Sequence, residues 1–111
     1  MYDEAAEILE VAPLTITNWI NNGKGRPGYL ELFEIYKTHG STAIESIKSE
    51  LDQYDWSKDA FISMIKKLGG YGEVSKAISV RRQTLYQTRI PSLGLKYLLL
   101  NLLKEKRNGI S

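Results

Sequence analysis

The sequence lacks the residues from which most metal and disulfide sites are built. Its 111 residues include no cysteine and a single histidine, His39. Without cysteine the chain has neither a disulfide framework nor a thiolate metal site, and one histidine cannot form a histidine metal cluster. We therefore expect no metal and no other cofactor.

Long apolar runs are also missing. The longest uninterrupted one, Tyr97–Leu100, is far too short to span a membrane. The first ten residues, MYDEAAEILE, are acidic and polar, unlike a signal peptide. With 42% hydrophobic and 25% charged residues, the composition is that of an ordinary globular domain. These features predict a cytoplasmic protein without a membrane partner.

Motifs for catalysis are absent as well. Residues 23–28, GKGRPG, match the G-x-G-x-x-G pattern of dinucleotide-binding loops, but that fingerprint requires a strand before it and a helix that begins on its glycines. Here a helical pattern precedes it and Pro27 interrupts it. We expect a connector in which Lys24 and Arg26 are placed to touch phosphates, and we expect neither an enzyme nor a small-molecule site.

The net charge of +2 conceals an uneven distribution along the chain. Residues 1–55 contain 4 Lys/Arg and 10 Asp/Glu, whereas residues 56–111 contain 11 Lys/Arg and 3 Asp/Glu, so the two halves carry −6 and +8. The second half attracts a polyanion such as nucleic acid and the first half repels it.

All segments have helical spacing and none alternates as a strand would, which predicts an all-α protein. Helices are expected over residues 3–10, 13–22, 29–38, 42–54, 57–68, 73–79, 81–89 and 91–107. In the second of these, Ile16, Trp19 and Ile20 form the expected buried side. Thr42 and Glu45 match a capping box at the start of the fourth.

A pattern recurs at an offset of 69 residues. When Val11 is aligned with Val80, AEILEVAPLTITNW (residues 6–19) lies opposite SKAISVRRQTLYQT (residues 75–88). Both contain a small residue, an aliphatic residue, a valine and a second aliphatic residue at equal spacings. The small residue lets two helices cross closely, the next two fill the angle between them, and the last anchors the second helix with its other face outward.

Both segments resemble the helix-turn-helix motif of the phage-repressor (Cro-like) family, whose pattern is roughly A-x-x-L-G-V-S-x-x-T-V-S-x-W. The resemblance implies two tandem helix-turn-helix units, at residues 1–40 and 56–111. A linker helix over residues 41–55 either joins the two units or closes the core of the first. Two family positions differ. The turn glycine is replaced by Glu10 and Ser79, and the capping serine is replaced by Ala12 and Arg81. A positive φ at such a turn residue costs about 1 kcal/mol, so we expect these turns to differ slightly from the family's.

In this family the second helix of the motif enters the major groove, and that role is implied for residues 81–89. Arginine pairs with guanine and glutamine with adenine, so base contacts are expected from Arg81, Arg82, Gln83 and Gln87. Phosphate or methyl contacts are expected from Thr84 and Tyr86, and phosphate contacts from Arg89 and Lys76. The alternative is that these residues form a solubilising surface.

The same role is implied for residues 13–21 in the first unit, with base contacts from Thr17, Asn18 and Asn21. The acidic residues around this helix oppose tight binding, so a packing or dimer scaffold is an equal alternative.

The last helix has a second apolar stripe, formed by Leu93, Tyr97, Leu100 and the stem of Lys104. We expect this stripe to form the seam of a homodimer, and the alternative is that it is buried between the two units.

The leading functional hypothesis is a sequence-specific transcriptional regulator that binds double-stranded DNA, a repressor of phage or mobile-element type. The alternatives are a DNA-binding accessory factor in recombination or replication, and a protein-interaction module that uses the acidic half.

Overall fold

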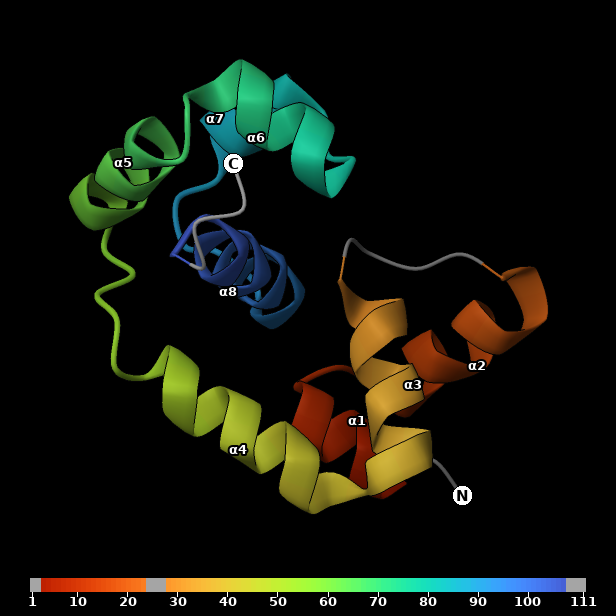
Figure 1. Ribbon diagram of the computed structural model, residues 1–111. Helices are drawn as coiled ribbons and strands as arrows, with labels where there is room; N and C mark the ends of the chain where they lie inside the picture. Colours follow the sequence, from red (N-terminus) through yellow and green to blue (C-terminus); the bar gives the residue numbers. More distant parts are fainter. Residues whose placement is uncertain (1–2, 24–27, 108–111) are drawn as a thin grey trace.

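A computed structural model describes residues 3–23 and 28–107. Within these ranges the chain forms eight α-helices and no strand, which confirms the all-α prediction (Figure 1). The helices are α1 (Asp3–Leu9), α2 (Pro13–Asn22), α3 (Tyr29–His39), α4 (Ser41–Leu51), α5 (Lys58–Lys67), α6 (Tyr71–Ile78), α7 (Arg82–Gln87) and α8 (Leu93–Arg107).

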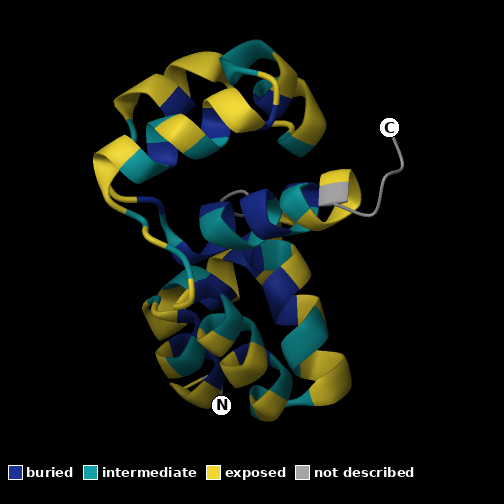
Figure 2. Ribbon diagram, turned by 60° about the vertical axis from the view of Figure 1, so that its left-hand side comes forward, coloured by how far each residue is buried: buried dark blue, intermediate teal, exposed yellow. Residues whose placement is uncertain are grey.

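The helices enclose two hydrophobic clusters that share α8. The first cluster is formed mainly by α1 to α4, and the second mainly by α5 to α7. α8 lies between them and supplies Leu93 and Leu100 to the first, and Leu95, Leu99 and Leu102 to the second (Figure 1). Figure 2 shows that the buried residues of both groups lie mainly on their inner sides, toward α8.

The second apolar stripe of the last helix is used inside the chain. Leu93 and Leu100 are buried in the first cluster and Tyr97 packs against it. Lys104 pairs with Glu50 of α4, with 3.0 Å between Nζ and Oε1. The stripe therefore joins α8 to the first cluster, and it is not available as a dimer seam.

The predicted linker helix is α4, and it belongs to the first cluster. It contacts α1 and α3, and its Ile44 and Leu51 are buried there. Residues 52–57, which lead to α5, are not helical. The predicted capping box of Thr42 and Glu45 is wrong, because α4 begins at Ser41 and has no side-chain cap.

Trp56 tethers this non-helical connection. Its Nε1 donates a hydrogen bond of 2.8 Å to the Leu51 carbonyl oxygen, and its ring packs against both clusters. The Lys96 ammonium lies 5.6 Å from the ring centroid on the α8 side.

Three local predictions need correction. Ile20 is 48% exposed rather than buried, because α2 packs through Ile16 and Trp19 and Ile20 lies past the edge of that side. α6 begins two residues early, at Tyr71. α7 ends at Gln87 because Thr88 is extended, so Arg89 lies beyond the helix, and Arg81 is the N-cap residue rather than a helical one.

The start of α3 lies directly against the start of α8. Gly28 has φ of +84°, and a Cβ atom added to it would overlap the backbone carbonyl of Gly94. Only glycine satisfies both conditions at position 28, so Gly28 lets the first cluster close on α8.

We predict that Gly28→Ala lowers the free energy of unfolding by at least about 2 kcal/mol, because it adds both a steric overlap and left-handed strain. Gly23→Ala is the matched control, because Gly23 has φ of +66° and nothing lies within 4 Å of an added Cβ. The control should cost about 1 kcal/mol. Urea unfolding measures both, and equal losses would contradict the close approach of α3 and α8.

Candidate nucleic-acid interface

The pairs α1–α2 and α6–α7 share the same turn geometry. Glu10 and Ser79, which are equivalent in the repeat, have φ of +63° and +58°, and they are the only non-glycine residues with positive φ in the described chain. Both turns therefore adopt the left-handed conformation that the sequence marks as costly for these residue types.

The hydrogen bonds that close the two turns are equivalent as well. The Val11 amide donates to the Ala6 carbonyl oxygen at 2.9 Å, and the Val80 amide donates to that of Ser75 at 3.2 Å. This is the six-to-one bond of a Schellman ending. Neither Ala12 nor Arg81 caps the next helix with its side chain, as the sequence predicts.

Leu85 fixes which face of α7 is outward. It is 1% exposed in the second cluster, where Val80 is also buried. The predicted contact residues of this unit are all exposed, and they are Lys76, Arg81, Arg82, Gln83, Thr84, Tyr86, Gln87 and Arg89. One buried anchor therefore leaves nearly the whole helix open to a partner.

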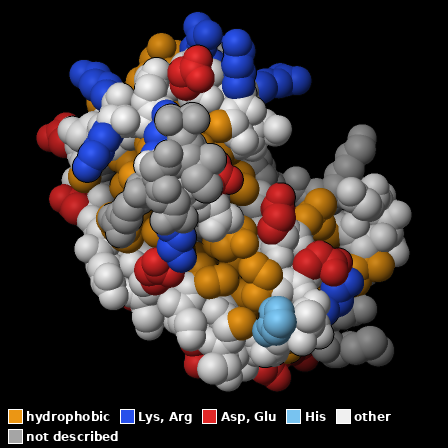
Figure 3. Space-filling model, viewed as in Figure 1, with side chains coloured by type: hydrophobic (Ala, Val, Ile, Leu, Met, Phe, Trp, Pro, Cys, Tyr) orange, Lys and Arg blue, Asp and Glu red, His pale blue; other side chains and the backbone are white. Residues whose placement is uncertain are grey.

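The cations of this surface are free of acidic partners. Within the part of the chain that the structure describes, the side chains of Lys76, Arg81, Arg82 and Arg89 form no ion pair and no hydrogen bond. The three ion pairs found there are instead Lys37–Glu34, Lys48–Glu10 and Lys104–Glu50. Figure 3 shows Lys and Arg side chains gathered over the end of the molecule that carries α5 to α7.

The corresponding face of α2 has different chemistry. Thr17, Asn18 and Asn21 are exposed, as predicted, but α2 contains no charged residue. At the positions of Arg81, Arg82 and Arg89 the first motif has only apolar residues, namely Ala12, Pro13 and Ile20. On the neighbouring α1, the acidic residues Asp3, Glu4 and Glu7 are exposed. The predicted phosphate contacts Lys24 and Arg26 lie outside the described residues.

Two contacts at this surface were not predicted from the sequence. The Tyr71 and Tyr86 rings are stacked, with centroids 4.1 Å apart and planes 18° from parallel. The Arg82 guanidinium passes over Gly72, where an added Cβ would lie 3.2 Å from Nη2. The sequence pattern predicts a helix only from residue 73, so it leaves Tyr71 and Gly72 outside the helix in which the structure places them.

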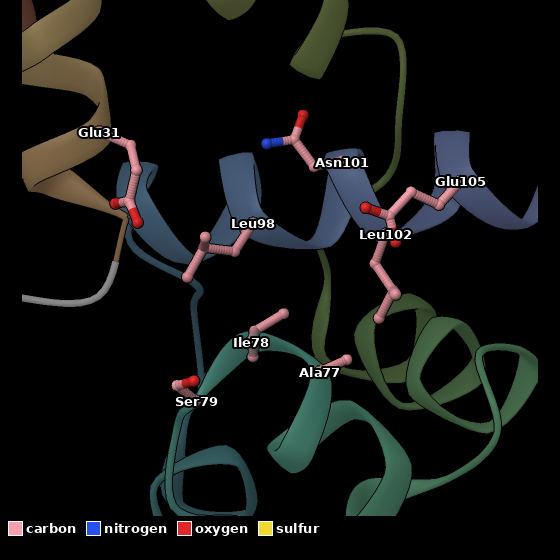
Figure 4. Close-up of a pocket in the computed structure, with 8 residues that line it drawn as sticks. All are labelled: Glu31, Ala77, Ile78, Ser79, Leu98, Asn101, Leu102 and Glu105. Carbon is pink, nitrogen blue, oxygen red and sulfur yellow. The ribbon is translucent and has the colours of Figure 1, made fainter.

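A hollow of about 290 Å³ lies behind the turn of the second motif. Figure 4 shows Ala77, Ile78 and Ser79 on one side, α8 on another, and Glu31 of α3 at one end. Glu31 and Glu105 place two carboxylates at the hollow, which therefore repels a polyanion. The exposed cations of this unit lie instead on the face that α7 presents.

No described helix meets the length and hydropathy needed to cross a membrane. Residues 3–23 and 28–107 also contain no group of three side chains suited to hold a metal ion. In comparisons with known proteins, no family model, no curated protein and no solved structure matches the chain.

We predict that Ser79→Gly raises the free energy of unfolding by about 0.5–1 kcal/mol, because glycine adopts positive φ without the strain of a Cβ atom. Ser79→Ala is the control, since it removes the hydroxyl but keeps the strain. In urea unfolding, the alanine variant should have a free energy of unfolding close to that of the wild type. Equal stability of the glycine and alanine variants would contradict the left-handed turn.

Proposed function

We propose that the protein is a sequence-specific regulator that binds double-stranded DNA and that α7 is its reading helix. The observation that carries this proposal is the exposed, unpaired set of arginine and glutamine side chains on a helix anchored by Leu85 alone. Guanidinium and amide groups of this kind pair with guanine and adenine edges in the major groove.

The two helix pairs support an interpretation as tandem helix-turn-helix units. They share the turn geometry, the closing hydrogen bond and a buried aliphatic anchor in the second helix, Ile16 in one and Leu85 in the other. A role as a repressor of phage or mobile-element type rests on the resemblance of the motifs alone.

Only the second unit is proposed to supply affinity for DNA. α2 has no cation with which to contact a phosphate, and the carboxylates of α1 repel the backbone. Each chain would then occupy one half-site. Pairing of two chains on DNA stays a prediction, and the stripe on α8 no longer supports it.

The central test replaces Arg81 and Arg82 together by alanine. We expect duplex affinity to fall by at least about tenfold, because each good arginine–guanine pair contributes about 1–3 kcal/mol. The matched control is Lys66→Ala with Lys67→Ala, which removes the same charge from exposed positions of α5. Fluorescence anisotropy over a range of salt concentrations measures both variants. A loss as large in the control would show that net charge alone binds DNA.

Selection from a random duplex library tests how many units read DNA. The enriched sequences show how many segments are recognised, and the mass of the complex gives the number of bound chains. We expect one recognised segment for each bound chain. Two different segments per chain would assign reading to α2 as well and would contradict the single-reader proposal.

A further inference from the structure

The first turn of α6 lies against the side chains of the reading helix. Tyr71 stacks on Tyr86 at 4.1 Å, and the backbone of Gly72 lies under the Arg82 guanidinium. Arg82 and Tyr86 are four residues apart, so they share one side of α7. Two consecutive residues of α6 thus contact two neighbouring side chains of the proposed DNA-binding face.

These contacts restrict side chains that are otherwise free. Tyr86 is 60% exposed and its hydroxyl forms no hydrogen bond with the described residues, so the stacked ring of Tyr71 is what orients the side chain. Parallel stacking covers one face of the Tyr86 ring and leaves the other uncovered by Tyr71. Side chains held in place before binding lose less conformational entropy when the partner arrives.

We propose that Tyr71 and Gly72 are positioning residues for DNA recognition, which orient Tyr86 and Arg82 without touching a base. This inference rests on the proposed function of α7. The oriented Tyr86 ring presents an apolar face, which suits the C5-methyl group of thymine, and the neighbouring Arg82 suits guanine. The preferred duplex therefore contains a thymine close to a guanine in the segment that α7 contacts.

A substitution at Gly72 separates the contribution of this turn to folding stability from its proposed contribution to DNA binding. It has no positive φ, so alanine fits the helix and reduces the backbone entropy lost on folding. The added methyl group lies too close to Nη2 of Arg82, and the flexible guanidinium must move by a few tenths of an ångström. Stability and binding should therefore change in opposite directions.

The first experiment compares Gly72→Ala with the wild type. We expect the urea midpoint to be equal or higher, while affinity for the duplex selected by the wild type falls by about fivefold. Affinity for a random duplex should stay within about twofold, because the charge is unchanged. An unaltered preference for the selected duplex would overturn the role of Gly72.

The second experiment probes the tyrosine stack through the thymine methyl group. Each thymine of the selected duplex is replaced in turn by deoxyuridine, which removes only that methyl. In the wild type one replacement should weaken binding by about fivefold. In Tyr71→Leu the same replacement should have little effect, because the Tyr86 ring is no longer held.

Tyr71→Phe is the conservative control, since it keeps the stacking ring and should restore the sensitivity to deoxyuridine. A purely structural role of Tyr71 would change the urea midpoint without changing that sensitivity, and this result would overturn the inference.

The failure of the proposed function has a different signature. If the wild type enriches no duplex from the random library, α7 is not a reading helix and the function itself is wrong. If the wild type enriches a duplex that Gly72→Ala and Tyr71→Leu bind with unchanged affinity and deoxyuridine response, only the positioning roles are wrong.

Discussion

The fold depends on one helix that is apolar on two sides. Clusters as small as the two in this chain bury too little surface to be stable alone. α8 completes both, with Leu93 and Leu100 on one side and Leu95, Leu99 and Leu102 on the other. The same helix helps to hold the second cluster on which α7 rests. The orientation of the proposed reading surface therefore follows from burial of α8.

The two motifs show how one backbone arrangement carries two surface chemistries. Their inward positions are alike, since Ile16 and Leu85 anchor the second helix of each and both turns pass through the left-handed region. Their outward positions make little contribution to packing, so they can differ without loss of the fold. In one motif these positions hold arginines, and in the other they hold Ala12, Pro13 and Ile20. As a result, the end of the molecule with α7 carries exposed cations, whereas the end with α1 carries exposed carboxylates.

Much of the fold and part of the candidate site could be predicted from spacing. The eight helices, the buried role of Leu85 and the exposure of Arg81, Arg82 and Gln83 agree with the pattern. The predictions that fail concern apolar residues whose burial depends on which other helix packs against them. Ile20 has the correct spacing but lies beyond the edge of the cluster. The sequence could not tell which surface covers the second apolar stripe on α8. A stripe that packs against another copy of the chain and one that packs against the first unit have the same apolar composition.

The sequence by itself determined the helical class, the repeated motif and the separation of charge, because these follow from residue type and spacing along one chain. It could not determine what covers each face of α8, or that Tyr71 and Gly72 lie against Tyr86 and Arg82. Those contacts join side chains whose separation depends on how helices cross. Local periodicity shows which side of a helix is apolar, but only the packed structure decides which surface meets it.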